Sequence, residues 1–274
     1  MKKLSVITIN YNNASGLELT MESVFGQTFI DVEYVVIDGG SSDGSKELIQ
    51  ANAAKIDFWC SENDKGVYNA MNKGVLHATG EYVLFLNSGD YLYDSSVLAK
   101  ILPSLTGEGI VYGDLMFMPE GGGEGSVFVY PEILDVDYFM ERSLGHPASF
   151  IKRELLTVSP YNEEYRIVSD WEFFFRKIVY ESVTYKHVKL LVSVFDMGGI
   201  SNSQTDLCAR EREQVLHSFF PGMLYEYLQT CVELRKNPLY DEYCRLGRTG
   251  RLKKRLKPLL RCLLRLDDFF KQNK

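Results

Sequence analysis

Short apolar runs alternate with polar loops along the first ninety residues. The runs 4–9, 33–37, 58–60 and 82–86 each precede a loop rich in asparagine, aspartate, serine or glycine, which predicts four buried strands. Strands that alternate with helices and are apolar on both faces indicate a parallel sheet. We therefore expect an α/β fold with a mostly parallel, Rossmann-like sheet flanked by helices. The first three helices are expected between Ser15 and Gly26, from a cap at Ser45 through Ile49, and up to Gly80.

The pattern becomes less regular after Pro103. A strand at 110–112, a glycine-rich hairpin turn at 119–126 and a return at 127–130 predict an antiparallel excursion from the sheet. The remaining segments are an aromatic helix at 168–179, a last strand at 189–195 and helical sequence from Thr205. The length of 274 residues suits one large domain with an appendage.

Asp38 ends the second predicted strand. Loops at the carboxyl ends of parallel strands share one edge, where ligands bind in α/β sheets. The Asp38 carboxylate is therefore a candidate acceptor of hydrogen bonds from a base or ribose. The loop 38–44 is also typical of an Asx turn whose glycines supply positive φ, so both interpretations stay open.

Asp90 ends the loop 87–90, which follows the most apolar strand of the chain. Mn²⁺ and Mg²⁺ prefer hard oxygen ligands and often take one or two carboxylates, with substrate phosphates completing the shell. Asp90 is therefore a candidate metal ligand. The alternative is that it caps a helix beginning at Tyr91.

The segment 65–74 has the composition of a loop that enters a helix. Gly66 permits close backbone approach, and neighbouring side chains offer donors to sugar hydroxyls or phosphates. These candidates are Lys65, Asn69, Asn72 and Lys73. The alternative is a solvated helix face with ordinary capping.

Asp170 lies in an unusually aromatic setting, directly before Trp171. Partial burial is expected to raise its pKa and make it a base toward an acceptor hydroxyl. An acid at a helix start, favoured by the helix dipole, is the alternative. The histidines show no metal-ligand spacing and are assigned structural roles by default: His77, His146, His187 and His217.

Composition and missing motifs narrow the class of protein. The chain has no Walker loop, no Gly-x-Ser-x-Gly and no Gly-x-Gly-x-x-Gly, which disfavours P-loop, hydrolase and dinucleotide functions. Five scattered cysteines predict free thiols in a reducing compartment. Neither a secretory leader nor an apolar run of roughly 18 residues is found, so we expect a cytoplasmic protein. No nucleic-acid partner is expected.

The net charge of −7 hides a basic tail. From Arg245 onward there are eleven basic and two acidic residues, a balance of +9, which leaves −16 for residues 1–244. Leucines recur at helical spacing between the basic residues of 245–270. Such a segment suits the surface of an anionic membrane, at roughly 1 kcal/mol per basic residue. A helix packed on the catalytic domain or a coiled-coil homodimer is the alternative.

Several ordered motifs resemble the family 2 glycosyltransferases of the GT-A fold. They cover roughly residues 3–203 and are Thr8–Asn12, Val36–Ser45, Glu62–Gly74, Leu86–Asp90, His146–Phe150, Val168–Glu172 and Gly198–Ser201. The resemblance implies a catalytic domain at 1–204, with a nucleotide-sugar half at about 1–115 and an acceptor half at about 116–204. Residues 205–274 then form a helical extension.

The resemblance also implies residue roles. Ile9, Asn10, Tyr11 and Asp38 would line the nucleoside pocket. Asp90, beside Asn87 and Ser88, would occupy the position of the family's Asp-x-Asp-type metal motif, and Asp170 would be the base. Two departures stand out, because Asp90 is the only carboxylate in its loop and Ser169 replaces a glutamate often found before the base.

The expected function is inverting transfer of a sugar from a nucleotide-diphosphate donor to a glycan or lipid-linked acceptor. The resemblance implies Mn²⁺ or Mg²⁺ as cofactor and a role in bacterial surface polysaccharide synthesis, at the inner face of the plasma membrane. A catalytically silent nucleotide-sugar-binding protein and a sugar nucleotidyltransferase are the alternatives.

Overall fold

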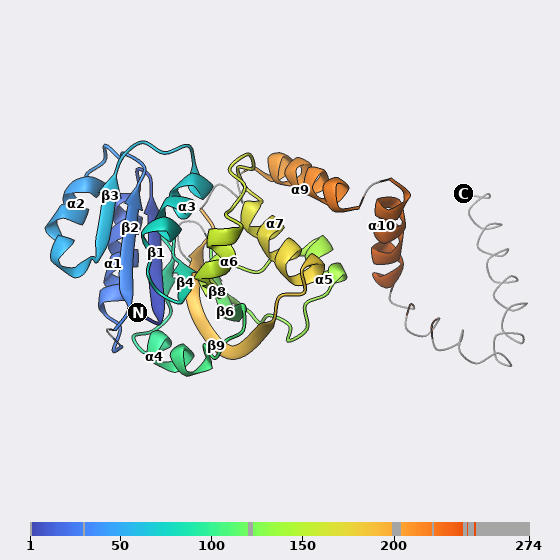
Figure 1. Cartoon of the computed structure of the whole chain (residues 1–274), viewed down its shortest axis with the longest axis horizontal. Coiled ribbons are helices and arrows are strands. Elements are labelled where there is room, and N and C mark those ends of the chain that lie inside the picture. The colour runs from blue at the N-terminus through green and yellow to red at the C-terminus, as the bar shows by residue number, and fades with distance from the viewer. Residues whose placement is uncertain are drawn as a thin grey trace, which may run out of the picture. The chain divides into compact units, whose positions relative to one another are not determined.

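The computed structural model describes residues 2–29, 31–119, 123–198, 204–220, 222–237, 240 and 244. Contacts divide the chain into two units, Met1–Val215 and Leu216–Lys274. The first unit is built on a nine-stranded sheet with the order β3-β2-β1-β4-β8-β6-β9-β5, and β7 pairs with β6 (Figure 1). The expected α/β fold is confirmed.

Four parallel strands form the first half of the sheet. They are β1 (Leu4–Asn10), β2 (Glu33–Asp38), β3 (Phe58–Ser61) and β4 (Tyr82–Phe85), close to the runs predicted from the sequence. In the register, Asn10 lies opposite Asp38 and Asp38 opposite Ser61. β1, β2 and β4 are buried along their whole length, as their unbroken apolar pattern requires.

The second half of the sheet contains the reversals. β8 (Ser149–Lys152) runs antiparallel between β4 and β6 (Ile110–Met118), while β9 (Tyr185–Asp196) is parallel to β6. β7 (Ser126–Phe128) and β5 (Tyr91–Leu92) add antiparallel pairs to β6 and β9. The sequence pattern predicted the excursion and the last strand, but not β5 or β8.

Helices cover both faces of the parallel strands. α1 (Ala14–Phe25) and α2 (Ser45–Ala51) contact each other on one face, where Phe25 meets Tyr34 of β2. α3 (Val67–His77) lies on the other face, against β1 and β2 (Figure 1). Alternation along β2 explains this division, because residues 34 and 37 point to opposite sides and Ile37 faces α3.

The close approach of α3 depends on Gly74. A Cβ atom on this residue would lie 2.4 Å from Cγ2 of Ile7 on β1. Only a glycine lets the helix approach this closely, so the position of α3 over the sheet is set partly by the absence of one methyl group.

Three helix ends differ from the sequence-based expectations. α1 begins at Ala14, one residue before Ser15, and Asn13 caps it by accepting from the Gly16 amide. Ser45 is the first helical residue of α2 and follows a cap at Gly44, which supplies no side chain. α3 ends at His77, where Ala78 is already extended, so the helix stops before Gly80.

Short helices complete the first unit. They are η1 (Ala53–Lys55), α4 (Val97–Ile101), η2 (Leu102–Ser104), α5 (Val136–Glu141), η3 (His146–Ala148), α6 (Arg153–Val158), α7 (Ser169–Phe175) and η4 (Arg176–Tyr180). The expected aromatic helix is α7 together with the π-helical turn η4. Its Trp171 is buried and donates to the Phe139 carbonyl over 2.9 Å.

The expected domain boundary at 204 falls just before α9 (Thr205–Phe219), whereas the contacts place the division at 215. The reason is that residues 205–215 of α9 belong to the first unit. The Glu211 carboxylate accepts from the Arg166 and Ile167 amides, and the Arg212 guanidinium lies 4.7 Å from the Trp171 ring centroid. The second unit contains α10 (Met223–Arg235).

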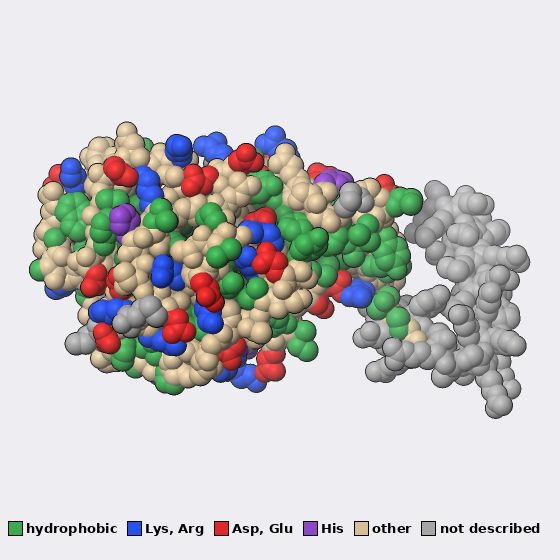
Figure 2. Space-filling view, in the orientation of Figure 1, with side chains coloured by type: hydrophobic (Ala, Val, Ile, Leu, Met, Phe, Trp, Pro, Cys, Tyr) green, Lys and Arg blue, Asp and Glu red, His purple; other side chains and the backbone are tan. Residues whose placement is uncertain are grey.

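The basic tail at 245–270 lies outside the described residues. Within the described part of the chain, no helix has both the length and the apolar character needed to cross a bilayer. On the visible face of the first unit, acidic and basic side chains are interspersed (Figure 2).

Candidate active site

Loops from three parallel strands meet at the carboxyl edge of the sheet. The Gly39 amide donates to the Asn10 carbonyl over 2.9 Å, and the Ser88 amide donates to the Ile9 carbonyl over 3.0 Å. The Glu62 amide donates to the Asp38 carbonyl in the same way. The sequence-predicted loops therefore share one edge, as parallel strand order requires.

Asp38 is fully buried at this edge and holds the loops together. Its carboxylate accepts from the Asn10 amide at 2.8 Å, from the Ser61 hydroxyl at 2.6 Å and from the Ser41 hydroxyl and amide. Burial raises the pKa of Asp38, but the hydrogen bonds from Ser41, Ser61 and Asn10 outweigh it and hold the pKa below its usual value. The turn interpretation describes these bonds, and a contact with base or ribose stays a prediction.

Tyr11 is the exposed member of the predicted nucleoside pocket. Its side chain is 66% exposed, whereas Ile9 and Asn10 are buried. One ring carbon of Tyr11 lies 3.1 Å from the position that a Cβ on Gly39 would take. The aromatic ring therefore stands beside the Asp38 loop with its surface open to solvent.

The side-chain amides of Asn69 and Asn72 on α3 face the chain segment 161–163. Asn72 donates to the Tyr161 carbonyl and accepts from the Tyr161 amide, at 2.9 and 3.0 Å. Asn69 and Asn72 both donate to the Glu163 carboxylate, and Lys73 pairs with Glu62 at 2.7 Å. These amides dock the segment 161–163 onto α3, and their contact with a donor stays a prediction.

Lys65 and Gly66 directly precede α3, and Gly66 is its N-cap residue. The Asn69 side chain accepts from the Lys65 amide, and the Asp64 carboxylate accepts from the Gly66 amide. Both residues are exposed. The loop before the helix is therefore organised by its own side chains and leaves the Lys65 side chain at the surface.

Asp90 is buried, with an exposed fraction of 3%. Oδ1 accepts from the Asp196 amide at 3.2 Å, and Oδ2 accepts no hydrogen bond from a described residue. Burial raises the pKa of Asp90 to about 7, against the partial compensation of His146. The residues after Asp90 form β5, so the helix-cap interpretation is wrong.

Thr20 of α1 shapes the turn that carries Asp90. Its hydroxyl donates to the Asp90 carbonyl at 2.7 Å and accepts from the Gly89 amide at 3.0 Å. Gly89 has φ of 108°, a conformation that side chains rarely adopt. A Cβ there would lie 3.3 Å from an Asp196 carboxylate oxygen, which places this second carboxylate beside the turn.

Asp170 lies in the first turn of α7 and accepts three contacts. Oδ1 accepts from the Tyr68 hydroxyl and the Trp171 amide, each at 2.9 Å, and Oδ2 lies 3.1 Å from Nδ1 of His146. Burial raises the pKa of Asp170, but the hydrogen bond and charge of His146 and the bond from Tyr68 lower it further. The pKa is therefore below its usual value, and the expected rise is wrong.

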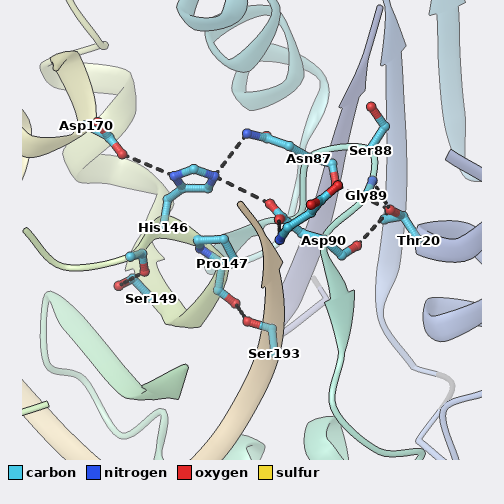
Figure 3. Close-up of polar contacts among 12 residues, drawn as sticks. Thr20, Asn87, Ser88, Gly89, Asp90, His146, Pro147, Ser149, Asp170 and Ser193 are labelled. Carbon is cyan, nitrogen blue, oxygen red and sulfur yellow. Dashed lines mark hydrogen bonds and ion pairs between the residues drawn. The ribbon is translucent and has the colours of Figure 1, made fainter. Parts of the chain in front are cut away.

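His146 connects the two candidate acids, which the sequence analysis did not foresee (Figure 3). Its Nε2 lies 3.0 Å from Nδ2 of Asn87 and 3.8 Å from Oδ2 of Asp90, while Nδ1 faces Asp170. The side chain is 12% exposed. In the sequence, the one signal for His146 is its place in the family-like motif 146–150. Metal-ligand spacing is the wrong test for a histidine that contacts carboxylates.

Comparisons with known proteins identify the family of this chain. The family described as "Glycosyl transferase family 2" matches residues 5–127. A "PGL/p-HBAD biosynthesis glycosyltransferase" of Mycobacterium tuberculosis is 32% identical over 211 residues, which cover 74% of this chain and 80% of the relative. A "GalNAc(5)-diNAcBac-PP-undecaprenol beta-1,3-glucosyltransferase" of Campylobacter jejuni is 31% identical over 60% of this chain and 56% of its own length.

Solved structures share the fold. TarS of S. aureus in complex with UDP-GlcNAc superimposes with a TM-score of 0.63 and 19% identity, over 84% of this chain and 70% of that chain. The mannosyltransferase PcManGT from Pyrobaculum calidifontis, in complex with GDP-Man and Mn2+, gives 0.60 and 17% over 96% and 80%. The chain therefore has the GT-A fold and belongs to glycosyl transferase family 2.

Proposed function

We propose that this glycosyltransferase moves a sugar from a nucleotide-diphosphate donor to a lipid-linked or glycan acceptor, with inversion at the anomeric carbon. The observation that carries the proposal is the environment of Asp170. This acid is largely buried, and its partners keep it ionised. The ring of His146 connects it to the Asp90 loop. An ionised acid in a water-poor site is suited to accept a proton from a hydroxyl.

The donor is expected at the carboxyl edge of β1, β2 and β4. Tyr11 offers an exposed aromatic surface for a base, and Asn10 and Asp38 form the buried polar floor beside it. Ser88 and Asn87 would approach the sugar diphosphate from the loop after β4. Of the α3 side chains, Lys73 is the best candidate to bind the diphosphate. Its salt bridge is with Glu62, which is 60% exposed, and an exposed salt bridge is weak enough to be exchanged for a phosphate.

The residues of the Asp90 loop fit a divalent metal. Asp90 has a buried carboxylate oxygen that accepts no hydrogen bond from the described residues, and Asp196 brings a second carboxylate beside Gly89. Oxygen ligands of this kind suit Mn²⁺ or Mg²⁺. When bound, the ion would neutralise the charge that grows on the departing diphosphate.

In the transfer step, the acceptor oxygen forms a bond to the anomeric carbon while the bond from that carbon to the diphosphate oxygen breaks. The electron pair leaves with the nucleotide diphosphate, and the acceptor proton passes to Asp170. Oδ2 is the oxygen for this, because Oδ1 already has two donors, Tyr68 and Trp171. A positioned base of this kind contributes roughly 10²–10⁴-fold to a rate.

The acceptor class follows from the relatives and the tail. One relative carries an undecaprenol-linked substrate in its name, and the basic segment 245–270 suits an anionic membrane. We place the enzyme at the cytoplasmic face of a bacterial plasma membrane, in the synthesis of a surface polysaccharide. This assignment rests on similarity and charge.

The test is a comparison of wild type with Asp170→Asn. UDP-, GDP- and dTDP-sugars are first screened with Mn²⁺ for thermal stabilisation, because a bound donor raises the unfolding temperature. Transfer to undecaprenyl-diphosphate-linked saccharides is then measured with the donor that binds. Asp170→Asn should lose roughly 10²–10⁴-fold in rate and keep the thermal shift.

Asp31, whose side chain is 77% exposed, supplies the control substitution Asp31→Asn, which should retain full activity. Unchanged turnover in Asp170→Asn would refute the base assignment. Absence of stabilisation by every donor would contradict the proposed function as a whole.

A further inference from the structure

We propose that His146 is the positioning residue of the transfer reaction. It holds the Asp170 carboxylate through Nδ1–H and connects it through Nε2 to the loop 87–90, where the donor diphosphate is expected. The proposal rests on the glycosyltransferase function proposed above and assigns one further residue to it. His146 would not touch the reacting atoms, and would act through Asp170 and Asn87.

The partners of the ring fix its tautomer. The ionised Asp170 carboxylate can only accept, so the proton lies on Nδ1 across the 3.1 Å contact. Nδ2 of Asn87 can only donate, so Nε2 accepts across its 3.0 Å contact. In this arrangement Nδ1 of His146 donates to Asp170, and Nε2 accepts from Asn87 in the loop 87–90.

The backbone around the ring is held from two sides. The Ser193 hydroxyl of β9 donates to the Pro147 carbonyl at 2.5 Å, and the Ser149 hydroxyl donates to the Gly145 carbonyl at 2.8 Å (Figure 3). Both serines are buried. The ring therefore stands on a fixed turn and can determine the position of a partner.

Asp170 needs such a partner on one oxygen. Oδ1 is fixed by Tyr68 and Trp171, whereas His146 is the described donor to Oδ2. The plane of the carboxylate is set by contacts on both oxygens. With a single donor, Oδ2 retains a lone pair for the acceptor proton, so His146 orients the oxygen that reacts without saturating it.

The second contact joins this base to the donor side. Asn87 belongs to the loop that also carries Asp90, and Nε2 of His146 is 3.8 Å from the Asp90 carboxylate. The ring thus spans the distance between the acceptor base and the loop expected to hold the donor diphosphate. Correct spacing of these two groups is what a two-substrate transfer requires.

Two substitutions separate the contacts. In His146→Asn, the amide nitrogen takes the place of Nδ1 and can still donate to Asp170, but the side chain no longer reaches Asn87. In His146→Gln, the amide takes the place of Nε2 and loses Asp170. His187 is a buried histidine paired with Asp114 at 2.8 Å, and His187→Asn is the matched control for loss of a buried contact.

We expect His146→Gln to lower kcat roughly ten- to hundredfold, the cost of one hydrogen bond to a charged group, with little change in KM for the donor. His146→Asn should recover most of this loss. Thermal stabilisation by Mn²⁺ with the donor that binds in the screen of UDP-, GDP- and dTDP-sugars should persist in both variants. His187→Asn should lower the unfolding temperature and leave kcat unchanged.

The ring also has a spectroscopic signature. The ¹⁵N spectrum of the wild type should show His146 as the Nδ1–H tautomer, identified by its disappearance in the variants. A proton on Nε2, equal kcat in the Asn and Gln variants, or retention by Gln alone would overturn the inference. Absence of turnover in the wild type would count against the proposed function, and the ring spectrum then decides the role of His146 by itself.

Discussion

Asp90→Asn should stabilise the metal-free protein while removing its response to Mn²⁺. Asp90 is 3% exposed, one of its oxygens accepts no hydrogen bond from the described residues, and its pKa is raised to about 7 by burial. A buried carboxylate without full hydrogen bonding destabilises the fold when it is ionised. An amide at this position carries no charge and escapes that cost.

The size of the effect follows from linkage. Because the folded pKa of Asp90 exceeds the unfolded value of 3.8, the unfolded chain loses its proton first as pH rises. Stability therefore falls between about pH 4 and 7 and is constant above. A rise of roughly three pKa units means that Asp90 lowers the free energy of unfolding by about 4 kcal/mol at pH 8 and by about 2 kcal/mol at pH 5. Asp90→Asn should lack this slope.

Urea unfolding with a chelator, at pH 5 and pH 8, measures the effect. The wild type should lose about 2 kcal/mol more than Asp90→Asn between these pH values. Asp94 is the contrasting control, since hydrogen bonds from Ser96 lower its pKa to about 2. Its contribution is lost only as pH falls toward 2, so Asp94→Asn should cost the same at pH 5 and pH 8.

The metal response completes the test. Mn²⁺ with the donor that binds in the screen of UDP-, GDP- and dTDP-sugars should raise the unfolding temperature of the wild type and not that of Asp90→Asn, because binding to the folded state alone stabilises it. Equal pH dependence in the two proteins would refute the burial reasoning. Equal Mn²⁺ stabilisation would refute Asp90 as ligand.

Three further predictions concern the sheet, the buried acids and the base. Gly74→Ala should cost about 1–3 kcal/mol in urea unfolding, because the new methyl group meets Ile7. Glu33→Gln should destabilise the protein most above pH 4.5. Burial raises the Glu33 pKa, but hydrogen bonds from Ser5, Thr79 and Gly80 lower it further, so the stability that Glu33 contributes is lost as pH falls. A difference in unfolding free energy between wild type and variant that stays constant from pH 6 to 3 would contradict this. The lowered pKa of Asp170 places the acid limb of its pH–rate profile below pH 3.8, and a limb near pH 6 that disappears in Asp170→Asn would contradict that placement.

The parallel half of the sheet could be predicted from sequence because its signal is local. Runs such as 4–9 and 82–86 are apolar on both faces, and this pattern survives whatever the rest of the chain does. The same logic predicted a shared edge for Asp38 and Asp90. Strand β5 escaped prediction because two residues give no periodicity to detect.

The position of His146 could not be predicted because β8 runs against its neighbours. A residue that precedes an antiparallel strand lies at the same edge as residues that follow parallel ones. In the sequence, the turn before Ser149 belongs to the family-like motif 146–150, but no local pattern shows that it lies at the same edge as the Asp38 and Asp90 loops. Reversal of one strand is a tertiary property, set by its pairing with β4 and β6.

The pKa of Asp170 shows a second limit of sequence reasoning. An aromatic neighbourhood indicates burial, and burial alone raises the pKa of an acid. The opposing contacts come from Tyr68 and His146, which are 102 and 24 residues away in the chain. The sign of the shift depends on these distant donors, so the local pattern could not determine it.

The docking of segment 161–163 on α3 bears on how far the sequence of this segment can vary. Asn72 holds the Tyr161 backbone by two bonds and shares the Glu163 carboxylate with Asn69, so two side chains of α3 anchor the segment 161–163. A segment exchanged between relatives would keep its position on α3 if it retained the contacts with Asn69 and Asn72. Because the bonds to residue 161 are made to its backbone, the same anchor would hold a different side chain at this position.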